Sequence, residues 1–457
     1  MDVEEAIFES GILNACTNIP ELSSTNSSTT SVLSHGNHLP RENPVDHDTI
    51  TSAQKQSMNE KQRKLFRYVS HWSYMKMLDH ETLPFNIFLT GGAGTGKSLL
   101  ANCIKHEVEQ IFRTTLPSAD CVTVLLLTFT GTAAFNIHGQ TIHSALAIQN
   151  TKLPYVPLGQ DTLNTLRMKH EHLKLIVIDK ISMVDINMLC YISCRLQQRK
   201  ASPANQPFGY ISVLIVGDFF QLPPVRGKPL FDADPGSLVN LWSLFKKWEL
   251  DDIMRQKNDT EFAHLLNRIR ILRKCDNIAC ADEFTLQERL TSRQETYPEN
   301  ALHIYSRNID VTNHNNYMLH EYCHNIQTIY VVDVQYDSKG QKRKRKEPIT
   351  SHDSYLLVKL EIAVGAKVML TTNLHVSDGL VNGVCGIIEY IQTTESSTLV
   401  TVNFEDNSVG KKRKLLQPVT SDLTHHSLTG VVIKPHAETF VYRSKIITRQ
   451  QFPLKLA

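Results

Sequence analysis

Gly91-Gly92-Ala93-Gly94-Thr95-Gly96-Lys97-Ser98 is the stretch that decides the fold. A short apolar run at residues 85–90 precedes it, and apolar residues at helical spacing follow it. The stretch fits the pattern G-x-x-x-x-G-K-[ST], in which glycines let backbone N–H groups curl around phosphate oxygens. The start of the following helix adds partial positive charge at the same place. A strand, a glycine-rich loop and a helix in this order predict a loop that binds nucleotide phosphates.

Two side chains of this loop have defined chemistry. We expect Lys97 to reach the β- and γ-phosphates of a bound nucleotide, and the Ser98 hydroxyl to ligate Mg²⁺. The other candidate contacts are the loop residues before them, Gly91, Gly92, Ala93, Gly94, Thr95 and Gly96. The predicted cofactors are therefore ATP and Mg²⁺.

A second motif supports the first. Residues 175–179 read Leu-Ile-Val-Ile-Asp, a buried strand that ends in an acid, and Asp179 is expected to hold Mg²⁺ through water. Residues 122–128 and 211–216 are further apolar runs, and helical patterns separate the runs. Apolar strands alternating with helices predict an α/β fold, a P-loop NTPase core whose parallel sheet is covered on both faces.

Lys180 departs from this chemistry. In P-loop motors the position after the strand aspartate is usually a glutamate that orients and deprotonates the attacking water. A protonated lysine cannot accept that proton, although it can pair with a phosphate. We therefore expect ATP binding to survive and hydrolysis to fall by orders of magnitude, unless another carboxylate such as Asp185 substitutes.

Composition excludes several classes of protein. The 457 residues suffice for two or three domains, and the net charge of +2 confines any nucleic-acid surface to local patches. The nine cysteines include no C-x-x-C pair, which favours reduced thiols of the nucleus or cytosol over a zinc site. The sequence contains no run of 18 apolar residues, so no membrane span is predicted. The acidic N-terminus is unlike a targeting peptide.

The chain divides into five predicted segments. Residues 1–57 are polar and predicted to be disordered, and residues 58–250 form the first motor domain. Residues 251–310 begin a second α/β unit, with a helix at 261–273 and a strand at 301–305. Residues 311–440 have short Val/Ile/Thr-rich runs and turn signals at 338–340, 382–383 and 406–407, typical of a small β-barrel insert. Residues 441–457 return to the second motor domain.

The motifs together resemble those of a known family. Residues 59–62 read Asn-Glu-Lys-Gln, residues 128–134 read Thr-Phe-Thr-Gly-Thr-Ala-Ala, and residues 139–144 read Gly-Gln-Thr-Ile-His-Ser. Residues 217–225 read Gly-Asp-Phe-Phe-Gln-Leu-Pro-Pro-Val, and residues 254–256 read Met-Arg-Gln. In this order they resemble the petite-integration-frequency (PIF-type) DNA helicases of superfamily one, the 5′-to-3′ branch, including copies carried by Helitron-type transposons.

The resemblance implies roles for single residues. Gln62 would read adenine, Gln221 would sense the γ-phosphate, and Arg255 would touch the γ-phosphate from the second domain. The residues alone also allow simpler roles. Gln221 is then an amide on the protein surface, and Arg255 is a solvated charge at the end of a helix. The resemblance also implies a RecA-like core, a second RecA-like domain and an SH3-like insert around residues 382–383. The family continues beyond residue 457 into further motifs, so we expect an incomplete second domain and a truncated product or fragment.

The expected partner is single-stranded DNA, with forked or structured DNA as the substrate that the resemblance implies. The candidate contacts are Thr130, Phe135, His143, Asn308 and Asn315, and His143 is alternatively a core histidine without a catalytic role. The basic runs at 342–346 and 411–414 are phosphate contacts, nuclear import signals or solvated hairpin loops. The resemblance implies the nucleus as location, and roles in the DNA damage response, DNA repair, recombination and telomere maintenance.

Three functions compete at this stage. The first is an ATP-dependent DNA helicase that translocates on single strands. The second is a hydrolysis-impaired, ATP-gated DNA-binding relic, because of Lys180 and the missing C-terminal motifs. The third is an unrelated P-loop ATPase such as an AAA-type remodeller or a nucleotide kinase, and the string at residues 217–224 argues against it.

Overall fold

The structure is a computed structural model. It describes residues 53–118, 120–149, 151, 155–203, 206–225, 227–232, 240–255, 259–272, 276–288, 303–336, 342–345, 348–349, 356–393, 398–416, 430–442 and 445–457. The described residues fall into two compact units: a first unit within Met1–Phe129 and Gly139–Arg289, and a second unit within Thr130–His138 and Leu290–Ala457. Most of the predicted disordered segment 1–57 lies outside the described residues, which begin with one helical turn at residues 53–56.

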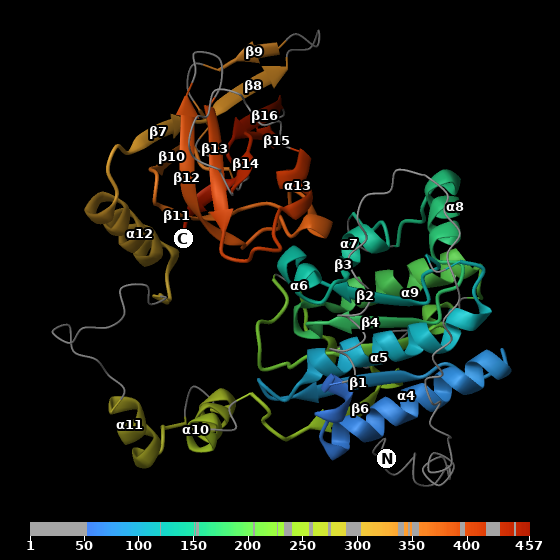
Figure 1. The fold of residues 1–457 in the computed structure, drawn as a ribbon. Coiled ribbons are helices and arrows are strands. Elements are labelled where there is room, and N and C mark those ends of the chain that lie inside the picture. The colour runs from blue at the N-terminus through green and yellow to red at the C-terminus, as the bar shows by residue number, and fades with distance from the viewer. Residues whose placement is uncertain are drawn as a thin grey trace, which may run out of the picture. The chain divides into compact units, whose positions relative to one another are not determined.

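The first unit is built on one parallel sheet in the order β3-β2-β4-β5-β1-β6 (Figure 1). Its strands are β1 (Asn86–Gly91), β2 (Val124–Thr128), β3 (Gln140–Thr141), β4 (Leu175–Asp179), β5 (Ser212–Val216) and β6 (Lys246–Leu250). Its longer helices are α4 (Glu60–Leu78), α5 (Lys97–Phe112), α8 (Gln160–Lys169), α9 (Ile186–Lys200), α10 (Thr260–Ile271) and α11 (Cys280–Gln287), with the short α7 (Ile142–Ala145). The predicted α/β class and parallel sheet are confirmed.

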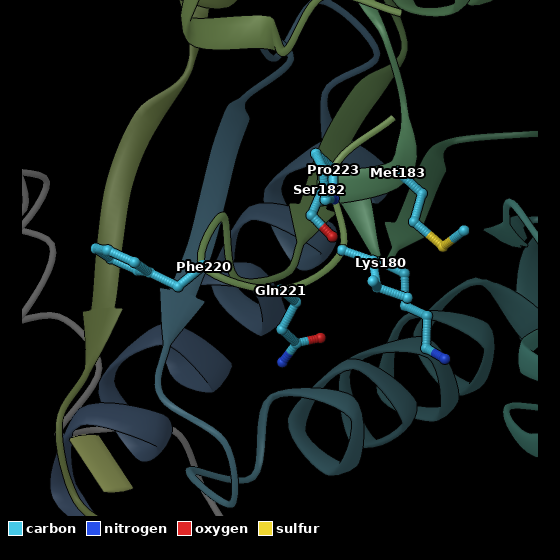
Figure 2. A pocket seen from close by; sticks show the side chains of 7 residues that line it. Lys180, Ser182, Met183, Phe220, Gln221 and Pro223 are labelled. Carbon is cyan, nitrogen blue, oxygen red and sulfur yellow. The ribbon is translucent and has the colours of Figure 1, made fainter. Parts of the chain in front are cut away.

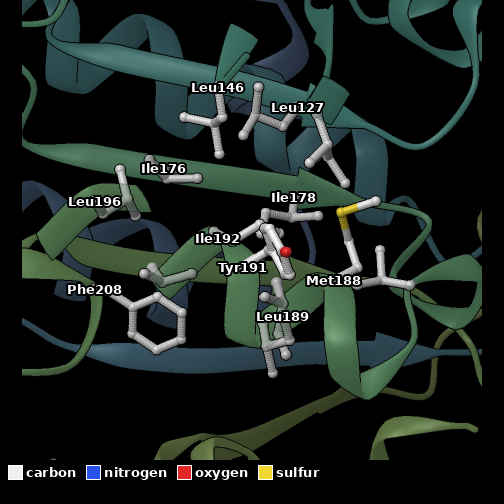
Figure 3. Packing of buried hydrophobic residues seen from close by; sticks show 14 of the residues in the cluster. Leu127, Leu146, Ile176, Ile178, Met188, Leu189, Tyr191, Ile192, Leu196 and Phe208 are labelled. Carbon is white, nitrogen blue, oxygen red and sulfur yellow. The ribbon is translucent and has the colours of Figure 1, made fainter. Parts of the chain in front are cut away.

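Side-chain alternation along the strands explains why the sheet is covered on both faces. Every residue of β2, β4 and β5 is buried, as expected for central strands of a parallel sheet. One set of alternate positions, which includes Ile176 and Ile178, packs with α9 residues such as Ile192 and Leu196 in a single cluster (Figure 3). Because neighbouring strand residues point to opposite faces, the other set lies on the α5 side of the sheet. Each fully buried aliphatic side chain contributes about 1.5–3 kcal/mol.

The second unit is built from antiparallel sheets. A five-stranded sheet has the order β14-β13-β12-β11-β17, a four-stranded sheet the order β15-β16-β8-β9, and β10 pairs with β7. The strands are β7 (Gln327–Tyr330), β8 (Val332–Tyr336), β9 (Lys342–Lys344), β10 (Lys359–Ile362), β11 (Lys367–Leu370), β12 (Cys385–Thr393), β13 (Thr398–Phe404), β14 (Val431–Ile433), β15 (His436–Tyr442), β16 (Lys445–Gln451) and β17 (Leu454–Leu456). The helices are α6 (Gly131–Asn136), α12 (Asn308–Tyr322) and α13 (Lys411–Leu416). The β-rich part begins at Gln327, because residues 311–322, predicted as part of the β-rich insert, belong to helix α12.

A buried ion pair ties two strands of the second unit together. Arg449 of β16 donates through Nε and Nη2 to the two carboxylate oxygens of Asp333 in β8, at 2.9 and 2.8 Å. Burial alone would raise the pKa of Asp333, but the hydrogen bonds from Arg449 and from the Ile349 N–H outweigh it and hold the pKa below its usual range. Stability from this depressed pKa is present above the unfolded-state value and is lost as pH falls through the folded-state value.

Several sequence expectations differ from the structure. The prediction of a strand at 301–305 is wrong for residues 303–305, which lie outside any strand. Residues 301 and 302 lie outside the described residues. The run 411–414 begins helix α13 rather than a hairpin loop. The turn signal at 338–340 lies outside the described residues, whereas 382–383 form a turn and residue 407 begins another. No helix of the described residues combines the length and the apolar character that a membrane crossing requires.

Candidate nucleotide-binding site

The glycine-rich loop joins β1 to α5 at the carboxyl edge of the first unit's sheet. Gly94 and Gly96 have φ angles of 80° and 81°, a region that favours glycine, and Gly96 is the residue that caps α5. A Cβ on Gly91 would collide with the Leu250 carbonyl of β6. The loop therefore needs glycine both for its backbone angles and for its packing against the neighbouring strand.

Lys97 folds back over the start of the loop. Its Nζ donates to the carbonyl oxygens of Gly91 at 2.8 Å and Gly92 at 2.7 Å. Burial lowers the pKa of Lys97; Asp218 and Asp179 oppose that shift, and the charges of Arg270 and Arg255 add to it. A cation that is half-buried and lies beside two arginines is stabilised by an anion, and a phosphate group supplies one.

Ser98 at the start of helix α5 contacts Asp179 at the end of strand β4. The Ser98 hydroxyl, in the first turn of α5, donates to Asp179 Oδ2 at 3.0 Å. Asp179 ends β4 and is only 7% exposed, and its Oδ1 accepts the backbone N–H of Lys180 at 2.8 Å. A hydroxyl and a carboxylate are hard oxygen donors of the kind that Mg²⁺ takes alongside substrate phosphates. The pair fits a Mg²⁺ ion bound at the foot of the phosphate loop.

Gln62 is tied to the loop from helix α4. Its Oε1 accepts the backbone N–H of Asn59 while its own backbone N–H donates to Asn59 Oδ1, which forms a capping box at the start of α4. Its Nε2 donates to the Thr95 carbonyl at 2.9 Å. The side chain is 2% exposed, so it braces the phosphate loop in this conformation.

Lys180 and Gln221, on the loops that follow β4 and β5, line one pocket. The pocket measures about 540 Å³, and its lining also includes Ser182, Met183, Phe220, Leu222 and Pro223. Figure 2 shows Lys180 and Gln221 on separate loops, with Phe220 pointing to the opposite side from Lys180. Lys180 has a φ of 59° and an exposed side chain. Asp185, the alternative carboxylate, caps helix α9 through the Met188 N–H at 2.7 Å.

Arg255 reaches the loop from within the first unit. The backbone N–H groups of Met254 and Arg255 donate to the Gly94 carbonyl at 2.8 and 3.1 Å. The expectation that Arg255 approaches from a second domain is therefore wrong, because the segment after β6 turns back onto the loop. Gln256 lies outside the described residues.

The sequence is similar to those of known helicases. A sequence model of the PIF1-like helicase family matches residues 57–277. The chain is 30% identical over 318 residues to the ATP-dependent DNA helicase PIF1 of Saccharomyces cerevisiae, and 29% identical over 385 residues to that of Homo sapiens. These alignments take in 67% and 81% of this chain but only 34% and 51% of the relatives, so the chain spans about a third to a half of their length.

The chain is thus similar to PIF1-like helicases along most of its length.

Solved structures extend the likeness beyond the matched segment. A structure of two coordinating Pif1 helicases that unwind forked double-stranded DNA has a TM-score of 0.58 and 26% identity, and covers 88% of this chain and 81% of that one. The structure of Bacteroides Pif1 bound to single-stranded DNA has a TM-score of 0.56 and 24% identity, over 87% of this chain and 81% of that one. The RecA-like core expected from the sequence is thus confirmed for this PIF1-like chain.

Sequence reasoning missed two residues of this PIF1-like site. Asp218 follows β5 and is 2% exposed, and Arg270 of α10 pairs with it at 3.2 Å. Asp218 lies in the same motif as Gln221, residues 217–225, so this motif already indicated that Asp218 belongs to the site. Arg270 carried no such signal, because it lies on a helix without a phosphate motif.

The candidate DNA contacts fall in both units. His143 belongs to the first unit, where it lies edge-on to Phe129 with ring centroids 5.6 Å apart, and burial lowers its pKa. Thr130 and Phe135 belong to the second unit. The Thr130 hydroxyl caps α6 by accepting the Ala133 N–H, and Phe135 is half-buried against its own unit's core. Phe135 therefore packs partly against its own unit's core in this conformation, and a DNA contact by it stays a prediction.

Two asparagines of α12 differ in their surroundings. Asn308 is exposed at the start of the helix. Asn315 is half-buried and its Nδ2 donates to the Leu456 carbonyl of β17 at 3.1 Å. Asn308 is thus the more accessible of the two for a DNA contact.

Replacement of Gln62 by alanine tests its structural role. We expect Gln62→Ala to lower the free energy of unfolding of the nucleotide-free chain by about 1–2 kcal/mol, because a helix cap and a buried hydrogen bond are lost. Urea denaturation followed by circular dichroism measures this. Gln110→Ala, at an exposed position late in α5, is the matched control. Unchanged stability in Gln62→Ala would show that the side chain acts on nucleotide alone.

Proposed function

We propose that this chain is an ATP-dependent DNA helicase motor that binds single-stranded DNA and moves along it in the 5′-to-3′ direction. The observation that carries the proposal is the convergence of Lys97, Ser98 and Asp179 at one edge of a parallel sheet, with Ser98 Oγ 3.0 Å from Asp179 Oδ2. A phosphate cradle with a paired oxygen site is the arrangement that nucleoside triphosphate hydrolysis uses.

Each residue has a task in the proposed reaction. The amides of residues 92–97 and the Lys97 ammonium bind the phosphates, and Ser98 and Asp179 hold the Mg²⁺ ion, which supplies charge neutralisation. Gln221 and Arg255 lie on the two loops beside the phosphate cradle and would respond to the γ-phosphate. Asn308 and the basic residues Lys411 and Lys412, all exposed, are proposed DNA contacts.

The substrate and the biological setting come from the relatives. The relatives are ATP-dependent DNA helicases, one related structure is bound to single-stranded DNA, and another concerns unwinding at forked double-stranded DNA. We extend to this chain a preference for forked or structured DNA, a nuclear location, and roles in the DNA damage response, repair, recombination and telomere maintenance.

A second candidate function rests on Lys180. The chain would then be an ATP-gated DNA-binding protein that holds nucleotide without efficient turnover. Lys180 supports it because the position beside Asp179 carries a cation where a P-loop motor needs a base, and because Asp185 already accepts the Met188 N–H as a helix cap. Phosphate release with and without single-stranded DNA separates the two: stimulation by DNA supports the motor, and tight ATP binding without turnover supports the gated binder.

Neutralising Lys97 tests nucleotide binding. We expect Lys97→Ala to weaken binding of Mg·ATP by about 10- to 100-fold, since charge-assisted hydrogen bonds of about 1.5–3 kcal/mol are lost. Equilibrium dialysis with labelled ATP measures this. Lys105→Ala is the matched control, because Lys105 lies on the same helix but pairs with Glu109 at 3.0 Å. Equal affinity in wild type and Lys97→Ala would refute the proposed site.

A carboxylate at position 180 tests whether Lys180 limits hydrolysis, as the second candidate function requires. We expect Lys180→Glu to raise DNA-stimulated phosphate release by about 10²- to 10⁴-fold, the usual contribution of a positioned general base. Lys180→Gln removes the charge without adding a base, so it should stay close to wild type. Equal turnover in wild type and Lys180→Glu would contradict the idea that Lys180 limits hydrolysis.

A further inference from the structure

Arg270 lies directly against the phosphate loop. It comes from α10, and its Nη1 lies 2.9 Å from the position that a Cβ on Gly92 would take. The same Gly92 presents its carbonyl oxygen to Lys97 Nζ at 2.7 Å. The two cationic groups therefore meet at one glycine of the loop that is expected to surround the phosphates.

Two contacts hold Arg270 there. Its Nη2 lies 3.2 Å from Asp218 Oδ1, and its guanidinium lies over the Phe220 ring, 4.8 Å from the centroid. Phe220 and Asp218 both belong to the loop after β5 that carries Gln221. Arg270 thus bridges α10, the phosphate loop and the loop that carries the proposed γ-phosphate sensor.

This ion pair leaves polar atoms without partners. Among the atoms of the described residues, Asp218 Oδ2 and Arg270 Nε are buried and have no hydrogen-bond partner. A planar guanidinium matches a carboxylate best through two parallel hydrogen bonds, and this pair has a single contact at 3.2 Å. A buried charge pair with unmet hydrogen bonds is weakly stabilised, and a better acceptor can displace it.

We propose that Arg270 is a ligand of the terminal phosphate of the bound nucleotide, and that Asp218 and Phe220 hold its guanidinium beside the loop until that phosphate arrives. The proposal rests on the proposed function, because it needs the loop to bind a nucleoside triphosphate. The terminal phosphate has oxygens free for a forked donor, and Lys97 already lies at the same glycine. A diphosphate lacks this group, so Arg270 would distinguish ATP from ADP.

If Asp218 and the phosphate compete for Arg270, substitutions of the two residues change the affinity for triphosphate in opposite directions. A simple structural ion pair would not give this result. Removal of the guanidinium takes a ligand away from the nucleotide. Removal of the Asp218 charge frees the guanidinium and makes it available to the nucleotide. The two substitutions should therefore change affinity for a triphosphate in opposite directions, whereas both would weaken it if the pair only maintained the fold.

The experiment measures the affinities of the full chain for Mg·ATPγS and Mg·ADP by isothermal titration calorimetry. We expect Arg270→Gln to weaken ATPγS by about 10- to 100-fold and ADP by less than about threefold. Asp218→Asn should tighten ATPγS by about threefold or more. Arg270→Lys, which keeps the charge without the fork, should fall between wild type and Arg270→Gln. The matched control is Arg268→Gln, on the same helix but paired with Asp282.

Each outcome has one meaning. If Arg270→Gln binds ATPγS like wild type, or if ATPγS and ADP weaken equally, the inference is overturned while the proposed function stands. If Asp218→Asn weakens ATPγS while its circular dichroism melt matches wild type, the ion pair is structural and the inference is likewise overturned. If wild type binds neither nucleotide, the proposed function itself fails.

Discussion

The contact between Ser98 and Asp179 depends on strand register, and the rest of the site depends on that contact. In the parallel sheet, Asp179 of β4 pairs with Val216 of β5, and Val216 pairs in turn with Leu89 of β1. The carboxyl ends of three strands therefore lie at one edge, where the phosphate loop, the acid and the loop carrying Gln221 come together. A shift of one residue in β4 would turn Asp179 to the other face of the sheet and remove its carboxylate from Ser98.

The site is electrostatically unbalanced without an anion. Lys97, Arg255 and Arg270 all lie near one short loop, and burial lowers the pKa of Lys97. Backbone carbonyls and Asp218 serve as substitute acceptors for these groups. In the proposed complex, a triphosphate with Mg²⁺ would satisfy more of these donors than the protein does alone, and its binding free energy would come from replacing weak internal contacts with charge-assisted ones.

Local patterns predicted the elements with strong periodicity or strict backbone demands. The buried run 175–179 is the whole of β4, and three of the four glycines of the phosphate loop, Gly91, Gly94 and Gly96, have positive φ angles. Pattern reasoning missed β6, because its residues alternate between exposed and buried at the edge of the sheet and include two lysines and a glutamate. It did not foresee that Gln62 would brace the loop, since that role depends on the approach of α4, and it missed Arg270 because only tertiary packing brings α10 to Gly92.

Hydrogen–deuterium exchange of the wild-type chain, with and without Mg·ATP, tests the central claim most directly. If the backbone amides of residues 92–98 hold phosphate, their exchange slows when nucleotide is added, and the slowing disappears when EDTA removes the magnesium. Exchange in this segment that stays the same with saturating Mg·ATP would contradict the account, whatever the chain does with DNA.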